Sequence, residues 1–138
     1  MTDLRTWFRT PEGPARAVDG VSFRLEEGET LGIVGESGCG KSVTALSLTR
    51  LVPEPPAEVR PGSSVRLRGE ELLDAPESRL REVRGGEIAM VFQEPATSLN
   101  PVLTVGAQVV EALEEHRDLG GRAAREEAVA LLGRVGIP

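Results

Sequence analysis

The sequence predicts an α/β fold with a central parallel sheet, a smaller antiparallel β part and helices toward the C-terminal end. The first observation is a glycine-rich loop at residues 35–42, which reads Gly-Glu-Ser-Gly-Cys-Gly-Lys-Ser. The apolar run 31–34 before it has the length of a buried strand. Residues 42–51 after it contain no Gly or Pro, so they predict a helix that stops before Pro53.

Two kinds of strand pattern provide the second observation. Residues 88–92 are continuously apolar, as a central parallel strand would be. In contrast, residues 21–26 and 65–68 alternate apolar and polar side chains, which suits an antiparallel sheet with one face in water. Both kinds of strand in one chain predict a parallel core sheet with an antiparallel addition.

Three further segments are predicted from the positions of glycine and proline and from the spacing of apolar residues. Residues 53–62 hold four prolines and are predicted as a loop. Residues 77–84 predict a short exposed helix that Gly85 and Gly86 close. Beyond Pro101 two amphipathic helices are expected, with apolar faces formed by Val105, Val109 and Leu113 and by Ala124, Ala128, Leu131, Leu132 and Val135.

Composition excludes several classes of protein. The net charge is −6 and no long basic stripe is present, which argues against nucleic acid as a partner. The apolar runs are too short to span a membrane, and the first five residues lack the apolar core of a signal peptide. Cys39 is the only cysteine, so no internal disulfide can form, and a cytoplasmic location is expected.

The glycine-rich loop matches the phosphate-binding pattern G-x-x-x-x-G-K-[ST] at every fixed position. Its glycines let successive N–H groups turn toward a phosphate, and the helix that follows adds the positive end of its dipole. Lys41 would bring a charge to the β- and γ-phosphate oxygens, and Ser42 a hydroxyl to Mg²⁺. The alternative is an ordinary Gly-rich turn. The predicted nucleotide-binding residues are Gly35, Glu36, Ser37, Gly38, Cys39, Gly40, Lys41, Ser42 and Val43.

A family resemblance now becomes specific. Four segments carry it: Ala-Val-Asp-Gly-Val-Ser-Phe at 17–23, the loop at 35–42, Met-Val-Phe-Gln-Glu-Pro at 90–95, and Thr-Ser-Leu-Asn-Pro at 97–101. The chain resembles the front half of an ATP-binding cassette (ABC) transporter ATPase, in the branch that serves oligopeptide, dipeptide and nickel importers. The resemblance implies a P-loop NTPase fold, with an ATP-binding core over 1–95 and the start of an α-helical subdomain over 96–138.

The same resemblance assigns further site residues. Gln93 would be the glutamine that reaches Mg²⁺ and the attacking water, which makes it a catalytic residue together with Lys41; its alternative is an ordinary polar residue after a buried strand. Phe8 would stack on adenine, with Trp7 adjacent as the other candidate, unless the ring simply faces the core. Residues 94–103 would face the transmembrane permease subunits.

Elements that hydrolysis requires in this family are not found. None of the four aspartates (Asp3, Asp19, Asp74 and Asp118) ends a run of four apolar residues and precedes a glutamate. No Leu-Ser-Gly-Gly-Gln signature is present, and the single histidine, His116, lies among charged residues typical of a helix surface. We therefore expect a truncated chain that binds ATP without hydrolysing it.

The predicted function is the ATP-binding portion of an importer ATPase for peptides, nickel or a similar solute. It would lie on the cytoplasmic face of the cell membrane, beside its permease and a second ATPase subunit. Two alternatives remain: an ABC-type ATPase outside transport, such as a repair or translation factor, and a non-catalytic fragment that binds nucleotide or a partner.

Overall fold

The computed structural model describes residues 1–92, 99–117 and 119–137. The chain divides into two compact units, Met1–Arg81 and Glu82–Pro138. The domain boundary expected after residue 95 falls among residues 93–98, outside the described part of the chain, and stays a prediction.

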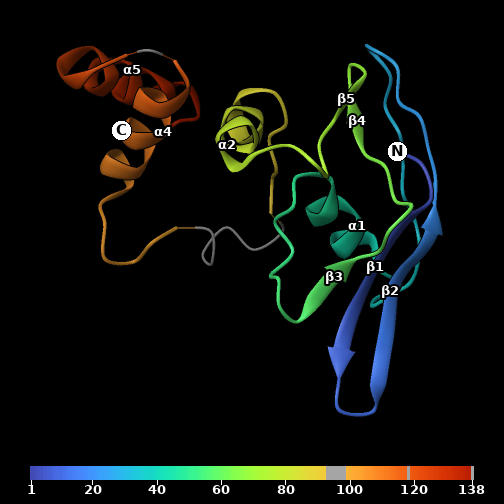
Figure 1. Ribbon diagram of the computed structural model, residues 1–138. Helices are drawn as coiled ribbons and strands as arrows, with labels where there is room; N and C mark the ends of the chain where they lie inside the picture. The colour runs from blue at the N-terminus through green and yellow to red at the C-terminus, as the bar shows by residue number, and fades with distance from the viewer. Residues whose placement is uncertain (93–98, 118, 138) are drawn as a thin grey trace. The chain divides into compact units, whose positions relative to one another are not determined.

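The first unit is built on an antiparallel hairpin (Figure 1). Strand β1 (Leu4–Thr10) pairs along its whole length with β2 (Gly13–Val21), and the short strand β3 (Ala57–Val59) pairs with the other side of β1. The strand order is therefore β2-β1-β3, with β1 in the centre.

Strand β3 corrects the prediction that residues 53–62 form only a loop. The prolines of this segment stand on either side of Ala57–Val59, so they leave the N–H groups of the strand itself intact. Two flanking hydrogen bonds extend the pairing: Arg9 N donates to Pro56 O at 2.9 Å, and Arg60 N donates to Arg5 O at 2.9 Å.

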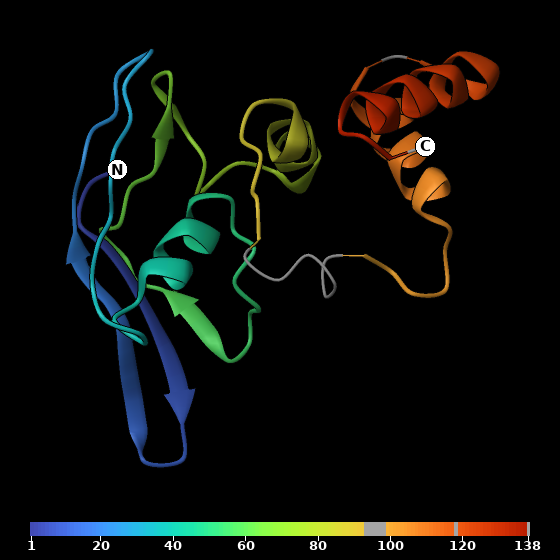
Figure 2. The same cartoon turned by 180° about the vertical axis from the view of Figure 1, so that it is seen from behind.

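Helix α1 (Lys41–Leu48) lies against one face of the hairpin, as both views of the ribbon show (Figure 2). The apolar core of this unit includes Leu4, Val18, Val65 and Leu72. Helix α1 contributes polar side chains to it, since Thr44 and Ser47 are its buried residues. The helix predicted over 42–51 is thus confirmed but ends earlier.

The two apolar runs predicted as parallel strands are not strands in this structure. Residues 31–34 are irregular, and Ile88 makes one isolated bridge to Arg84. Val34 and Val91 are 93% and 98% exposed. A parallel strand needs a neighbour that pairs along its length, and among the described residues neither run has one beyond the single bridge of Ile88. The described sheets are antiparallel.

The predicted alternating strands form only in part. Strand β2 ends at Val21, so residues 22–26 are outside it, and Leu25 is 53% exposed. Residues 65–68 contribute strand β4 (Arg66–Leu67), which pairs antiparallel with β5 (Glu70–Glu71).

Helix α2 (Glu77–Gly86) follows, with non-helical backbone at Arg84 and Gly85. The sequence predicts that this helix is exposed, but Leu80 and Val83 are fully buried. These residues are three apart, so they lie on one face of the helix and point inward together.

The second unit contains the helical hairpin of α4 (Val105–His116) and α5 (Gly121–Arg134), as predicted. Leu113, Ala124 and Ala128 form its buried core. Val135, which the sequence places on this packed face, is 72% exposed, because α5 ends one residue before it. No helix among the described residues is long and apolar enough to cross a membrane.

Candidate functional site

The glycine-rich loop leads directly into α1. Gly38 and Gly40 have φ angles of +82° and +93°, in the left-handed region that favours glycine. Cys39 lies between them, and its N–H donates to Glu36 O at 3.3 Å, which closes the turn. Alternation of left-handed and ordinary residues turns successive N–H groups toward a common point, as in anion-binding nests.

A bulge in β2 seats this loop on the hairpin. Thr6 pairs with Val18 and Trp7 with Arg16, so Ala17 has no partner on β1. The carbonyl of Ala17 lies against Gly40, where a Cβ would come within 2.1 Å of the Ala17 oxygen. The last glycine of the loop is therefore required both by its backbone angle and by close packing.

Lys41 turns back over the loop that precedes it. Its Nζ donates to Gly35 O at 2.8 Å and to Glu36 O at 2.7 Å, and lies 3.5 Å from Cys39 Sγ. The same sulfur occupies the space beside Gly35, where a Cβ would be 2.6 Å from it. The ammonium thus stands at the mouth of the loop, where a bound phosphate oxygen could replace the carbonyls as its partner.

The N-terminus of α1 is open to an anion. Gly40 is its N-cap, no side chain accepts a hydrogen bond there, and the first turn holds no acidic residue. Thr44 closes the first turn, with its N–H and hydroxyl both donating to Gly40 O at 2.8 Å and 3.0 Å. The remaining N–H groups of this turn and the helix dipole favour a negative ligand.

The two aromatic candidates lie on opposite faces of β1, because adjacent strand residues alternate. Trp7 lies between two guanidinium groups, those of Arg16 and Arg60, at 4.6 Å and 4.8 Å from the ring centroid. Phe8 is half-buried on the face of Thr6, which contacts α1. The surroundings of the two rings therefore favour Phe8 over Trp7 as a partner for a base.

The pairing of the hairpin also relates Phe8 to the loop. It pairs with Ala15, which is two residues from the bulged Ala17 beside Gly40. Two residues of strand correspond to about 7 Å. The register thus places Phe8 opposite a position two residues along β2 from the point where the loop packs on the hairpin, a relation that the sequence alone does not show.

Gln93 and residues 94–98 lie outside the described residues, so their predicted roles stay predictions. The rest of the predicted permease-facing segment, 99–103, is described. Gln108 fixes it to the start of α4: its Oε1 accepts from Asn100 N at 2.8 Å and its Nε2 donates to Asn100 O at 3.1 Å. Val102 is 87% exposed there.

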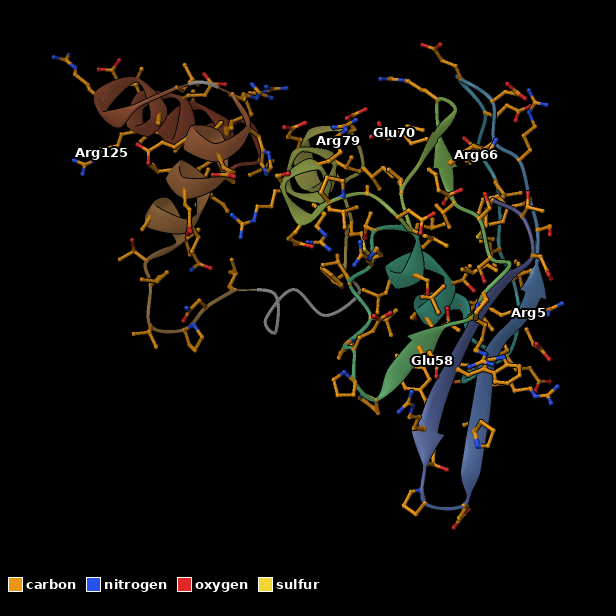
Figure 3. All side chains as sticks on the ribbon, viewed as in Figure 1. Arg5, Glu58, Arg66, Glu70, Arg79 and Arg125 are labelled. Atoms are coloured by element: carbon orange, nitrogen blue, oxygen red, sulfur yellow. The ribbon has the colours of Figure 1, made fainter. Side chains whose placement is uncertain are left out.

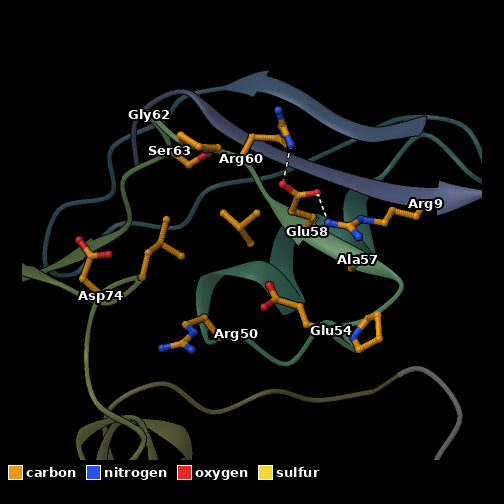
Figure 4. Close-up of a pocket in the computed structure, with 13 residues that line it drawn as sticks. Arg9, Arg50, Glu54, Ala57, Glu58, Arg60, Gly62, Ser63 and Asp74 are labelled. Carbon is orange, nitrogen blue, oxygen red and sulfur yellow. Dashed lines mark hydrogen bonds and ion pairs between the residues drawn. The ribbon is translucent and has the colours of Figure 1, made fainter. Parts of the chain in front are cut away.

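A cavity of about 580 Å³ lies away from the loop, between β3 and the segments around Arg50, Gly62 and Asp74 (Figure 4). Glu58 lines it, with Arg60 and Arg9 paired to its carboxylate at 2.5 Å and 3.3 Å. No residue of the loop 35–43 lines this cavity, so it is separate from the predicted phosphate site.

Two carboxylates outside the loop, Glu70 and Glu71, have pKa values lower than the ordinary value. Hydrogen bonds from Arg79 lower the pKa of Glu70, and the two side chains meet at the edge of the β4–β5 hairpin (Figure 3). For Glu71, burial raises the pKa, but the hydroxyl of Ser64 and the N–H groups of Val65 and Leu73 outweigh it, so the pKa is lowered. Neither group touches the loop, so both belong to the scaffold.

Sequence reasoning missed three contributors to the site: the Ala17 carbonyl, Thr6 and Ser47. The Ala17 contact leaves no mark in the sequence, because a bulge is a property of paired strands. A polar residue between Leu4 and Phe8 on one strand face is a weak signal for Thr6. Ser47 has no signal of its own, since a serine within a helix is ordinary.

Residues 18–138 match the ABC transporter family. The chain belongs to that family. Similar proteins include a protein of Brucella abortus (strain 2308) named "Putative peptide import ATP-binding protein", 55% identical over the whole chain and 41% of its own length. The oligopeptide transport ATP-binding proteins OppD and AppD of Bacillus subtilis (strain 168) are 46% and 44% identical, over 100% and 99% of this chain. The ABC chain spans 38% and 42% of their lengths.

The residues of this ABC chain fit the phosphates of a nucleotide: an uncapped helix N-terminus, left-handed glycines and an ammonium group meet at one place. For a divalent cation they offer less. Among residues 1–92, 99–117 and 119–137, no group of three or more His, Cys, Asp or Glu side chains could hold a metal ion. Ser42 could supply one ligand, with the phosphates and water supplying the others, as suits Mg²⁺.

Proposed function

We propose that this chain is the ATP-binding portion of an ABC importer ATPase that serves peptides or a similar small solute. The single observation that supports it most is the N-terminus of α1. No side chain caps it, Gly38 and Gly40 before it have left-handed backbone, and Lys41 Nζ bonds to the loop through Gly35 O. The relatives, named for peptide import and oligopeptide transport, support the choice of solute. Nickel is the alternative cargo within the same branch.

Within this proposal the loop residues Gly35 to Val43 bind the triphosphate, and the ring of Phe8 stacks on the adenine. Lys41 places its charge on the β- and γ-phosphate oxygens. Ser42 and Gln93, together with the phosphates, would hold Mg²⁺, which would supply positive charge to balance the charge on the transferred phosphoryl group. Lys41 and Gln93 are the proposed catalytic residues of the whole enzyme.

Hydrolysis by this chain alone is not expected. No aspartate in the sequence ends an apolar run and precedes a glutamate, so the carboxylates that hold Mg²⁺ and the attacking water are not supplied. We propose that the chain binds ATP and that phosphate release stays at background. Steady phosphate release that disappears in Lys41→Ala would contradict this.

We further propose that residues 31–34 and 88–92 become strands of a central parallel sheet when other strands pair with them. Their apolar composition supports this, as does the exposure of Val34 and Val91. The ATP-binding core would then cover 1–95 and the helical subdomain would begin in 96–138.

The proposed partners are transmembrane permease subunits, contacted through 94–103, and a second ATPase subunit in a homo- or heterodimer. Exposed apolar side chains at Leu99, Val102 and Leu103 support a protein contact in that segment. The chain would work at the cytoplasmic face of the cell membrane. A non-transport ABC ATPase and a non-catalytic nucleotide-binding fragment remain the alternatives.

Calorimetric titration with MgATP tests the proposal. An open half-site should bind with a Kd on the order of 1 mM, about −4 kcal/mol. Lys41 is the only lysine in the sequence, and Lys41→Ala should abolish the heat of binding. Arg125→Ala is the matched control, because it removes one positive charge from an exposed position on α5. Equal titrations for the wild type and Lys41→Ala would refute the phosphate site.

A further inference from the structure

We propose that Thr6 and Ser47 are positioning residues that hold Phe8 at a fixed place relative to the phosphate loop. The inference rests on the proposed nucleotide-binding function. It concerns the base end of the ligand, whereas the loop itself binds the phosphates.

The two side chains form a buried hydroxyl relay between β1 and α1. Thr6 Oγ1 and Ser47 Oγ are 2.8 Å apart, and both residues are 0% exposed. Ser47 Oγ donates to Val43 O at 2.7 Å. Because a serine hydroxyl has one proton, Ser47 then accepts from Thr6, and the direction of the relay is fixed.

The relay joins the two parts of the proposed site. Thr6 is two residues before Phe8, so both side chains lie on the face of β1 that α1 covers. Val43 is in the first turn of α1, directly after Lys41 and Ser42. A movement of β1 relative to α1 would therefore change the spacing between the ring and the phosphate loop.

The Thr6–Ser47 hydrogen bond contributes more to fixing the position of β1 on α1 than to the free energy of unfolding. Val18 pairs with Thr6 across the hairpin and Leu4 lies two residues before Thr6 on β1; they are 3% and 0% exposed, so two apolar side chains would suit this setting as well. A buried hydrogen bond adds little net free energy, but it is directional, and it penalises any arrangement that leaves a hydroxyl unpaired. The contact of Ala17 with Gly40 sets the loop on the hairpin, and the relay sets the register of helix and strand.

The test compares ATP with inorganic tripolyphosphate, which lacks a base, in phosphorus NMR titrations of the full 138-residue chain with Mg²⁺. Thr6→Val and Ser47→Ala should each weaken ATP binding about three- to tenfold. Tripolyphosphate should bind within about twofold of wild type, since it needs only the loop. Thr6→Ser keeps the hydroxyl and should restore ATP binding.

Two controls separate positioning from general destabilisation. Leu72→Ala removes a fully buried side chain of the same unit that takes no part in the relay's hydrogen bonds, so it should keep the wild-type ratio of the two Kd values. Phe8→Leu should weaken ATP binding in the wild type but have little further effect in Thr6→Val, because the two changes act through one contact. If Thr6→Val does not fold by circular dichroism, Ser47→Ala provides the same measurement.

Equal weakening of both ligands, or additive effects of Phe8→Leu and Thr6→Val, would overturn the inference while leaving the phosphate site intact. A wild-type chain that binds neither ATP nor tripolyphosphate would instead refute the proposed function, and the inference with it.

Discussion

The two flanks of the phosphate loop differ sharply in how this chain holds them. On the helix flank, Gly40 packs on the Ala17 carbonyl, and Ser47 bonds to Thr6 in the core. On the strand flank, Leu31, Ile33 and Val34 are 44%, 48% and 93% exposed. Both flanks have the residue pattern that their predicted element requires. Only the helix flank finds its tertiary partners within the described residues, which teaches that a motif's pattern alone does not build the element.

The largest effect on stability should come from Gly40→Ala, on the helix flank. A Cβ there would be 2.1 Å from the Ala17 oxygen. We expect a loss of about 3 kcal/mol or more of unfolding free energy, from overpacking of about 1–3 kcal/mol and left-handed strain of about 1–2 kcal/mol. ATP binding should be lost too. Urea unfolding followed by Trp7 fluorescence and an MgATP titration measure both.

Gly38→Ala is the matched control, because Gly38 has a similar φ of +82° but no atom within 4 Å of the place that a Cβ would take. It should cost only the backbone strain, about 1–2 kcal/mol. Equal losses for the two variants would mean that the contact with Ala17 does not form in solution.

The second prediction compares how MgATP affects the reactivity of a thiol on the helix flank and of one on the strand flank. Cys39 is the only cysteine, and its Sγ lies 3.5 Å from Lys41 Nζ. Saturating MgATP should slow its reaction with a maleimide about tenfold, equivalent to about 1.4 kcal/mol. In Cys39→Ser/Leu31→Cys, the thiol is on the strand flank and should react at a rate that MgATP does not change. Indifference of Cys39 itself would place its thiol outside the ligand's path.

The helical part of the fold was predictable because it depends on local pattern. The periodic apolar positions beyond Pro101 indicated both helices of the second unit, and the run without Gly or Pro after the loop indicated α1, which ends at Leu48, earlier than Pro53 requires. Strand β3 was missed because a three-residue strand gains its identity from β1 and not from its own sequence. The predicted strand at residues 31–34 is not confirmed for the same reason, since a strand pattern needs a partner strand.

Within the candidate site, the fixed motif positions were predictable because phosphate binding demands them. The motif predicted glycines that let the backbone turn and a helix from residue 42; the structure has left-handed φ at Gly38 and Gly40 and begins α1 at Lys41, one residue earlier. The support behind them was not predictable. The Ala17 carbonyl and the Thr6–Ser47 pair bring together residues distant in sequence, and their chemistry is ordinary when they are read singly.

The third prediction concerns the acid sensitivity of the β-hairpin on which the helix flank packs. Glu71 accepts from Ser64, and Ser64 exchanges backbone hydrogen bonds with Thr2 beside β1. The pKa of Glu71 is lower in the folded chain than its ordinary value of 4.5. Its contribution is therefore complete above pH 4.5 and lost as the pH falls through the folded pKa. We therefore expect the free energy of unfolding to fall over that pH range.

Urea unfolding at a series of pH values between about 7 and 3 measures this effect. Glu71→Gln should be less stable than wild type near neutral pH and should lose the part of the pH dependence that Glu71 supplies. An unchanged pH profile in Glu71→Gln would show that other carboxylates carry the acid sensitivity.

The smallest effect on stability is expected on the strand flank. It is measured by making the same change, Val to Ala, once on each flank. Val18 is 3% exposed beside Gly40, so Val18→Ala should cost about 2 kcal/mol of unfolding free energy. Val34 is 93% exposed, so Val34→Ala should change it by less than about 0.5 kcal/mol. It should also reduce self-association in light scattering, because exposed apolar segments recruit other chains. If Val34→Ala costs as much as Val18→Ala, the strand flank is packed in solution, and the contrast between the flanks disappears. If it leaves stability unchanged and lowers association, the strand flank is an unpaired apolar surface that takes another polypeptide as its partner.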